Sequence, residues 1–249
     1  MIVCKSPLEI EKMRRGGLLL WELLNELRAM AAPGLSTYDL EKVAAERIAK
    51  SGAQPAFKGY YEYPCVLCTS INNEIVHGIP SPRRILKEGD LLKIDVGVKT
   101  DGYYSDSALT VAVGNITPEL EKLMKVTEES LYAAIEQVQI GAHVGDVSSA
   151  VERYVEPHGY SVVRDFVGHG IGSKLHEDPK VPNYGTPGHG PKLKEGMVLA
   201  IEPMVNTGTY KTRILEDKWT AVTEDGGYSA HFEHCVVVTK NGPWILTKP

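Results

Sequence analysis

The first part of the chain alternates between apolar and polar positions at helical spacing. Between residues 7 and 31, apolar side chains recur every three or four positions, which predicts one long helix. A proline–glycine pair follows and would end it. Ser36 or Thr37 then offers an N-cap for a second helix that reaches Ala49. We therefore predict two consecutive helices.

The pattern next changes to that of strands. Apolar runs at residues 65–70 and 91–98 predict two strands, and residues 103–113 read as a third. Asp101 and Gly102 lie between the last two runs, and this dipeptide is typical of a two-residue hairpin turn. The sequence therefore predicts a β-hairpin at this point.

The second half repeats the order of the first. Helix signals begin at Thr117 and again near Val144. Residues 34–52 and 141–159 are segments of equal length, each bounded by glycines and each carrying an aspartate at the same place. Either any two capped helices look alike, or the chain holds two copies of a helix–helix–strand unit. We favour the second interpretation, with repeats at about residues 8–113 and 117–249.

This reading predicts an α+β fold. Two such units would pack about a pseudo-twofold axis around a central antiparallel sheet and leave a cleft at their junction. No long linker or low-complexity segment interrupts the 249 residues, so we expect a single domain.

Composition limits the class of protein. The net charge of −5 gives no reason to expect nucleic-acid binding. No run is long and apolar enough to span a membrane, and the first ten residues lack the pattern of a secretory signal. The four cysteines form neither a zinc-ribbon pattern nor a disulfide framework. We expect reduced thiols and a cytoplasmic location.

Two aspartates in the predicted hairpin are the first candidates for chemistry. A turn at Asp101 and Gly102 pairs Asp95 with Ala108, so that Asp106 becomes the diagonal neighbour of Asp95 on the same face. Two carboxylates on one buried face repel each other and lose hydration, which is costly unless a cation lies between them. The alternative is a solvent-facing strand side, which the apolar neighbours disfavour.

Three further side chains have unusual contexts. His169 lies in a glycine-rich run, Glu202 ends an apolar strand before a proline, and Glu233 precedes another apolar run. Each alone would be unremarkable. Together with Asp95 and Asp106 they form a set of four carboxylates and one imidazole, which suits two bridged divalent cations and not a structural zinc site. Such ligands fit Co, Mn, Fe or Zn without choosing among them.

Taken together, these motifs resemble those of the type I methionine aminopeptidases of peptidase family M24, which have the pita-bread fold. The motifs occur in family order over nearly the whole chain: Asn72-Asn73-Glu74-Ile75-Val76-His77-Gly78-Ile79-Pro80, Lys93-Ile94-Asp95-Val96-Gly97, Gly168-His169-Gly170-Ile171-Gly172, Leu175-His176-Glu177-Asp178-Pro179, Ile201-Glu202-Pro203-Met204 and Phe232-Glu233-His234.

The resemblance implies a role for each matching residue. The two metal ions would be held by Asp95, Asp106, His169, Glu202 and Glu233. A hydroxide shared by the ions would attack the first peptide carbonyl, with Glu202 as proton shuttle. His176 would stabilise the developing oxyanion. His77 would position the scissile amide, and the substrate's neutral α-amine would ligate one metal.

The resemblance also implies a methionine pocket with some departures from the family pattern. Its lining would include Tyr60, Tyr63, Cys68, Leu175 and Trp219. Among these, Leu175 stands where an aromatic residue is usual. Elsewhere, Tyr104-Ser105 replaces a common His-Gly pair, Cys65 and Leu67 are unusual, and His231 replaces a common glutamine close to Glu233. None of these changes removes a metal ligand.

The implied activity is removal of the starting methionine from nascent proteins, with a preference for a small second residue. A monomer acting near the ribosome, without direct nucleic-acid or membrane binding, is expected. One alternative is an Xaa-Pro aminopeptidase of the same fold, although those usually carry a sizeable N-terminal domain. The other is a metal-free pita-bread protein that only binds partners, which the complete ligand set disfavours.

Overall fold

The computed structural model describes residues 2–249 of the chain. All four predicted helices are present, with small shifts at their ends: α1 Pro7–Met30, α2 Thr37–Ser51, α3 Pro118–Glu136 and α4 Val144–Val155. Two short 3-10 turns, η1 Tyr60–Glu62 and η2 Glu156–His158, complete the helical structure described.

Side chains at the helix starts explain where α1 and α2 begin. Ser6 accepts a hydrogen bond from the Glu9 N–H, and the Glu9 carboxylate accepts one from the Ser6 N–H. Ser36 and Asp39 make the same reciprocal pair at α2. Each capping box satisfies two backbone donors that a helix end would otherwise leave unpaired. Of the two predicted caps, Ser36 is therefore the one used.

Within residues 2–249, fifteen strands form antiparallel ladders. They are β1 Gln54–Pro55, β2 Leu67–Ile71, β3 Glu74–Val76, β4 Leu91–Thr100, β5 Tyr103–Ala112, β6 Ser161–Val162, β7 Gly168–Gly170, β8 Glu177–Val181, β9 Val198–Ile201, β10 Met204–Asn206, β11 Thr212–Ile214, β12 Ala221–Thr223, β13 Ser229–His231, β14 His234–Thr239 and β15 Gly242–Ile245.

The predicted hairpin is β4–β5, and its predicted register is confirmed. Asp95 pairs with Ala108, and Asp106 pairs with Gly97 two positions further along β4. The turn residues Asp101 and Gly102 have φ angles of 51° and 86°. Positive φ at both central positions is what a type I′ turn requires, and aspartate followed by glycine tolerates it. The turn chemistry therefore fixes both aspartates on one face.

One predicted strand begins later than expected. The pattern predicted a strand from residue 65, but β2 begins at Leu67. The carboxylate of Glu41 on α2 accepts the N–H groups of Val66 and Leu67, at 2.8 and 2.9 Å. A side chain distant in sequence thus takes the hydrogen bond that a strand partner would have made, which a local pattern cannot reveal.

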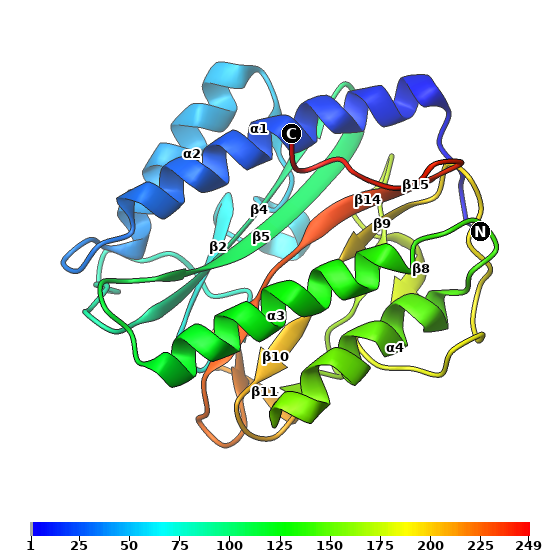
Figure 1. Cartoon of the computed structure of the whole chain (residues 1–249). Coiled ribbons are helices and arrows are strands. Elements are labelled where there is room, and N and C mark those ends of the chain that lie inside the picture. Colours follow the sequence, from blue (N-terminus) through cyan, green and yellow to red (C-terminus); the bar gives the residue numbers. More distant parts are fainter. Residues whose placement is uncertain (1) are drawn as a thin grey trace.

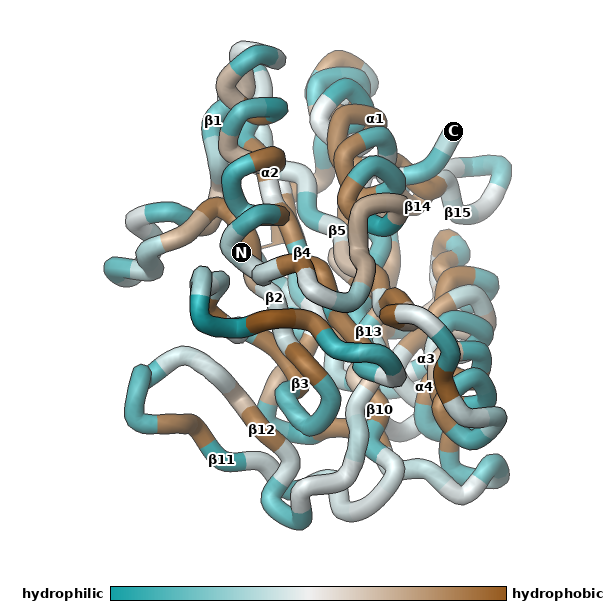
Figure 2. The backbone as a smooth tube through the Cα atoms, turned by 90° about the vertical axis from the view of Figure 1, so that its left-hand side faces the viewer, coloured by the Kyte–Doolittle hydropathy of each residue, from teal (hydrophilic) through white to brown (hydrophobic). Residues whose placement is uncertain are grey.

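The helices cover the strands as two layers, each with one of the two largest hydrophobic clusters beneath it. Helix α1 lies along β4 and β5, whereas α3 and α4 lie over strands of the second half (Figure 1). One core packs apolar residues of α1 and α2 on β2, β4 and β5, and another packs α3 and α4 on strands such as β9, β10 and β14. Hydrophobic segments accordingly concentrate inside the molecule, with hydrophilic loops outside (Figure 2). The mixed, wholly antiparallel architecture agrees with the predicted α+β class.

The two halves meet at β5 and β14. Ala108 and Glu233 form an antiparallel bridge, in which the Glu233 N–H donates to the Ala108 carbonyl at 2.9 Å. Thr110 of β5 likewise exchanges hydrogen bonds with the backbone of His231. This contact brings the Asp106 region of the first half against Glu233 of the second. Among residues 2–249, none of the helices has the length and apolarity needed to cross a membrane.

Candidate active site

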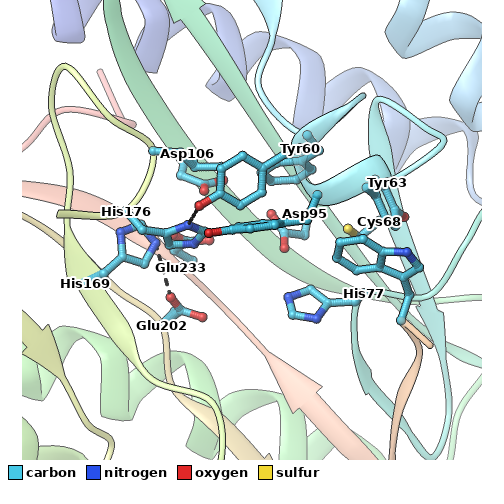
Figure 3. Close-up of a pocket in the computed structure, with 14 residues that line it drawn as sticks. Tyr60, Tyr63, Cys68, His77, Asp95, Asp106, His169, His176, Glu202 and Glu233 are labelled. Carbon is cyan, nitrogen blue, oxygen red and sulfur yellow. Dashed lines mark hydrogen bonds and ion pairs between the residues drawn. The ribbon is translucent and has the colours of Figure 1, made fainter. Parts of the chain in front are cut away.

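A cavity of about 290 Å³ opens where the two halves meet. Every residue that the sequence assigned to the site lines it: Tyr60, Tyr63, Cys68, His77, Asp95, Asp106, His169, Leu175, His176, Glu202, Trp219 and Glu233. In Figure 3 the carboxylates gather at one end, while Tyr63 and Cys68 lie at the other. The cavity therefore has a polar end and an apolar end.

Strands from both halves supply the polar end. Asp95 and Asp106 come from the β4–β5 hairpin, and His169 comes from β7. Glu202 directly follows β9, and Glu233 lies between β13 and β14, immediately before β14. Ligand atoms of Asp106, His169 and Glu233 all lie within 4.8 Å of one another. Residues distant in sequence thus converge as the ligand prediction requires.

Three carboxylate oxygens at this end lack a hydrogen-bond partner among residues 2–249. Asp95 Oδ1, Asp106 Oδ1 and Glu233 Oε1 are buried and make no hydrogen bond. Burial raises the pKa of Asp106 to about 7. It also raises the pKa of Asp95 and of Glu233 well above the usual range, and the neighbouring Asp106 charge adds to the effect. Buried acids that repel each other need a cation, so the donor set fits divalent metal.

His169 is oriented as a ligand. Its Nδ1 lies 2.8 Å from the Gly170 carbonyl, which has only lone pairs, so Nδ1 carries the proton and donates. The lone pair of Nε2 therefore faces the carboxylates, and Nε2 lies 3.7 Å from Glu202 Oε1. Burial lowers the pKa of His169 to about 3, which keeps the ring neutral. A neutral imidazole with a fixed tautomer is the form that binds metal.

His176 stands beside this cluster and is held by a tyrosine. The Tyr60 hydroxyl lies 2.7 Å from His176 Nδ1 (Figure 3). The centroids of the His176 and His169 rings are 4.3 Å apart. Burial lowers the pKa of His176. If the phenol donates to Nδ1, the proton of the neutral ring resides on Nε2, which can then donate to a substrate oxygen.

The apolar end is built from aromatic rings and a buried thiol. Tyr63 and Trp219 meet edge to face, with centroids 5.0 Å apart. Tyr63 is anchored because its hydroxyl donates to the Leu67 carbonyl at 2.8 Å. Burial raises the pKa of Cys68 well above its usual range, so this residue stays a thiol. The surface suits an unbranched thioether side chain.

His77 lies between the two ends in a strained backbone conformation. Its φ angle is 61°, a left-handed value that is uncommon for residues other than glycine. Its ring meets Phe166 and Trp219 edge to face, with centroids 5.5 and 6.3 Å away. Burial lowers the pKa of His77 to about 4, so the ring is neutral. Strain of this kind is tolerated where the surroundings fix a side chain in place.

Two lining residues were not predicted. Phe57 and Tyr61 also border the cavity, and Tyr61 has a φ of 44° with 79% of its surface exposed. They belong to a segment without periodic pattern, so no sequence signal singled them out.

His231, which departs from the usual family pattern, is 1% exposed, and neither ring nitrogen makes a hydrogen bond. Its Nε2 lies 3.9 Å from Glu202 Oε2.

The motifs, the fold and the five candidate ligands that line one cavity point to one class of enzyme. The model of metallopeptidase family M24 matches residues 11–240, and the chain belongs to this family. Membership means that the protein uses divalent metal, in agreement with the donor set.

Within the family, the chain is similar to methionine aminopeptidases. It is 52% identical to the methionine aminopeptidase of Clostridium perfringens, with 99% of each chain covered. It is 49% identical to methionine aminopeptidase 1 of Bacillus subtilis, with each chain fully covered. Its structure matches that of the Thermotoga maritima methionine aminopeptidase with a TM-score of 0.99, at 46% identity and full coverage of both chains.

Proline-specific relatives share the fold at greater distance. An Xaa-Pro dipeptidase from Bacillus anthracis gives a TM-score of 0.79 at 20% identity, and the match covers 62% of that chain. This likeness shows the fold alone. The resemblance to methionine aminopeptidases is thus confirmed, and the pita-bread architecture is shared across the family.

Proposed function

We propose that this protein is a methionine aminopeptidase that removes the first residue of newly made polypeptides. The observation that carries the proposal is the single cavity in which a five-residue ligand set adjoins a pocket of Tyr63, Cys68 and Trp219. Metal ions held by the ligand set would activate the water that hydrolyses the peptide bond, and the pocket suits a methionine side chain. Full-length relatives near 50% identity bear the same activity in their names.

The metal ions would bind at the polar end of the cavity. Divalent ions held by Asp95, Asp106, His169, Glu202 and Glu233 would supply Lewis acidity and an acidified water molecule. We propose two such ions, because four carboxylates exceed what one ion needs for charge balance. Their identity among Co, Mn, Fe and Zn is to be measured.

Glu202 is positioned to move a proton. Its carboxylate is 14% exposed and lies close to His169 and His231. Burial raises its pKa well above the usual range, and the nearby Asp106 adds to this rise. A carboxylate beside a metal-acidified water molecule could accept a proton from it and return that proton to the leaving amine. Glu202 is therefore our proton shuttle.

Two histidines act on the substrate amide. His176, neutral and hydrogen-bonded through Nδ1, would donate from Nε2 to the oxygen that becomes negative in the transition state. His77 would position the scissile amide from the opposite side of the cavity. Because both rings are neutral, each can donate a hydrogen bond to the substrate without adding a further positive charge next to the metal ions.

We further propose a preference for a small second residue. The ring of His77 packs against Phe166 and Trp219, so the wall next to the scissile bond is aromatic and rigid. A large second side chain would collide with this wall. A monomer in the cytoplasm, acting on nascent chains near the ribosome, agrees with the family resemblance.

A peptide assay tests the proposal. The purified protein, loaded separately with each of the four metals, should release methionine from Met-Ala-Ser and act far more slowly on Met-Leu-Ser. Proline-containing Ala-Pro-Ser serves as the control substrate for the Xaa-Pro alternative. Failure to release methionine with any metal, or faster cleavage of Ala-Pro-Ser, would contradict the assignment.

A further inference from the structure

The segment of residues 2–6, which precedes α1, lies against the active-site loop of residues 172–177. Figure 1 shows the N-terminal end beside the yellow loops that border β8. The Lys5 N–H donates to the Gly196 carbonyl at 2.7 Å. The Lys5 ammonium forms an ion pair with Glu177 Oε2 at 2.7 Å and donates to the Val3 carbonyl at 3.0 Å. This first segment is therefore fixed on both its backbone and its side chain.

Glu177 uses its second oxygen to close the active-site loop. Oε1 accepts hydrogen bonds from the Lys174 N–H at 3.1 Å and from the Ser173 hydroxyl at 3.2 Å. The residues between these contacts and Glu177 are Leu175 and His176, and both side chains line the cavity. One carboxylate thus joins the N-terminal segment to the loop that presents His176.

Two glycines leave the space that Lys5 occupies. A Cβ at Gly172 would lie 2.3 Å from Lys5 Cε and 2.8 Å from Glu177 Oε1. A Cβ at Gly196, where φ is +84°, would lie 2.6 Å from the Lys5 carbonyl oxygen. At Gly196 the contact is with backbone, so a side chain there is excluded, whereas at Gly172 a side chain would displace the Lys5 ammonium from its place. The loop and the segment before β9 are therefore shaped around Lys5.

The ion pair is buried, so its loss leaves an uncompensated charge. The side chains of Lys5 and Glu177 are only 3% and 9% exposed. Burial alone would raise the pKa of Glu177, but the hydrogen bonds from Lys5 and Lys174 outweigh it and lower the pKa. Glu177 is thus a carboxylate that needs its partner. Removing one member of a buried pair disturbs the geometry of the other.

We propose that Lys5 is a positioning residue for catalysis, acting through Glu177 to orient His176. The proposal rests on the proposed function, because it assigns to His176 the stabilisation of the transition state. Lys5 does not touch the cavity itself. Its removal should therefore leave substrate binding largely intact and weaken the hydrogen bond that counts only in the transition state.

The first test compares Lys5→Met with the wild type on Met-Ala-Ser. We expect kcat to fall about tenfold, which is less than the loss of about 100-fold or more when an oxyanion donor is removed entirely. KM should change less than about twofold. Lys5→Arg, which keeps the charge, should recover most of the loss. The matched control is Arg15→Met. It breaks the exposed ion pair between Arg15, on α1, and Asp101. It should leave kcat unchanged.

A double-mutant cycle with His176→Ala separates positioning from general stability. In the His176→Ala background, Lys5→Met should cause no further loss of kcat. An equal loss in both backgrounds, or an unchanged kcat in Lys5→Met alone, would overturn the inference while leaving the aminopeptidase assignment intact. An inactive wild type would instead overturn the assignment. If Lys5→Met does not fold, the isosteric Glu177→Gln carries the same cycle.

Discussion

At the scale of single residues, the hydrogen bond from Tyr60 to His176 controls where the imidazole proton resides. Replacing Tyr60 by phenylalanine removes the partner of Nδ1 while keeping the ring that borders the pocket. Both tautomers of His176 would then be populated, and we expect kcat to fall about fivefold to tenfold with little change in KM. Steady-state kinetics on Met-Ala-Ser would measure this. A rise in KM alone would mean that the hydroxyl serves the pocket and not the histidine.

Glu202 offers the most direct residue-level prediction. Glu202→Ala removes both a metal ligand and the proposed proton shuttle, so turnover should fall below detection. Glu202→Gln keeps the shape of the side chain but cannot accept a proton, and it should be nearly as inactive. Metal content by elemental analysis is the control, because bound metal in an inactive glutamine variant would identify the proton step as the cause. Activity retained in the alanine variant would refute the proposed mechanism.

At this same scale, the residues that the sequence singled out line one cavity, but the contacts that support them were not predicted. The proposed ligands were chosen by residue type and unusual context, and His77 and His176 were chosen from the motifs. Lys93 illustrates the limit, because it lies in a predicted apolar strand with no sign of what its charge would meet. Its ammonium is buried and donates to the carbonyls of Asn72 and Ser229, at 2.7 and 3.1 Å. Contacts to the backbone of distant loops carry no sequence signal.

At the scale of elements, the start of α1 is fixed by a charge. Glu9 accepts hydrogen bonds from the Tyr103 hydroxyl and from Ser6, and these lower its pKa from 4.5 to about 2. A carboxyl group whose pKa is lower in the folded state stabilises the fold at pH values above its unfolded-state pKa. This stabilisation is lost as the pH falls through the folded-state pKa. The contribution of Glu9 should therefore disappear between about pH 4.5 and about pH 2.

Glu9→Gln tests this expectation. At neutral pH the variant should have a lower free energy of unfolding than the wild type, and the difference should shrink as the pH falls below the unfolded pKa. Urea titrations at several pH values would measure it. Glu11→Gln, two residues further along α1, is the matched control and should show no such convergence. A difference independent of pH would mean that shape, and not charge, matters at this cap.

Elements were predictable where local chemistry decides them. The β4–β5 register followed from the Asp101-Gly102 turn, and α1, α2 and α3 followed from apolar periodicity and helix-start signals. Boundaries failed where a distant group intervened, as when Glu41 takes the N–H groups that would have extended β2. The unpredicted cavity residues Phe57 and Tyr61 lie in an aperiodic loop whose course depends on the strands around it.

At the scale of the whole molecule, the metal centre is also a source of stability. Without cations, the carboxylates of Asp95, Asp106 and Glu233 are buried against one another without compensation. Chelation should therefore abolish activity and lower the melting temperature, and re-addition of a binding metal should restore both. Scanning calorimetry with and without chelator would measure the shift. Ca²⁺ in excess is a control for general ionic effects, and an unchanged melting temperature would argue against occupied ligands.

The division of the chain into two repeats stays a prediction, but the position of the site between two cores has a consequence. The part before residue 113 carries two of the five proposed ligands, and the part after residue 117 carries three, so neither fragment could hold the complete proposed set. Peptide hydrolysis would thus report directly on reassembly if the chain were cut in that connection. A shift of the two parts at the bridge between Ala108 and Glu233 would separate the proposed ligands and abolish activity, while each hydrophobic core remained folded.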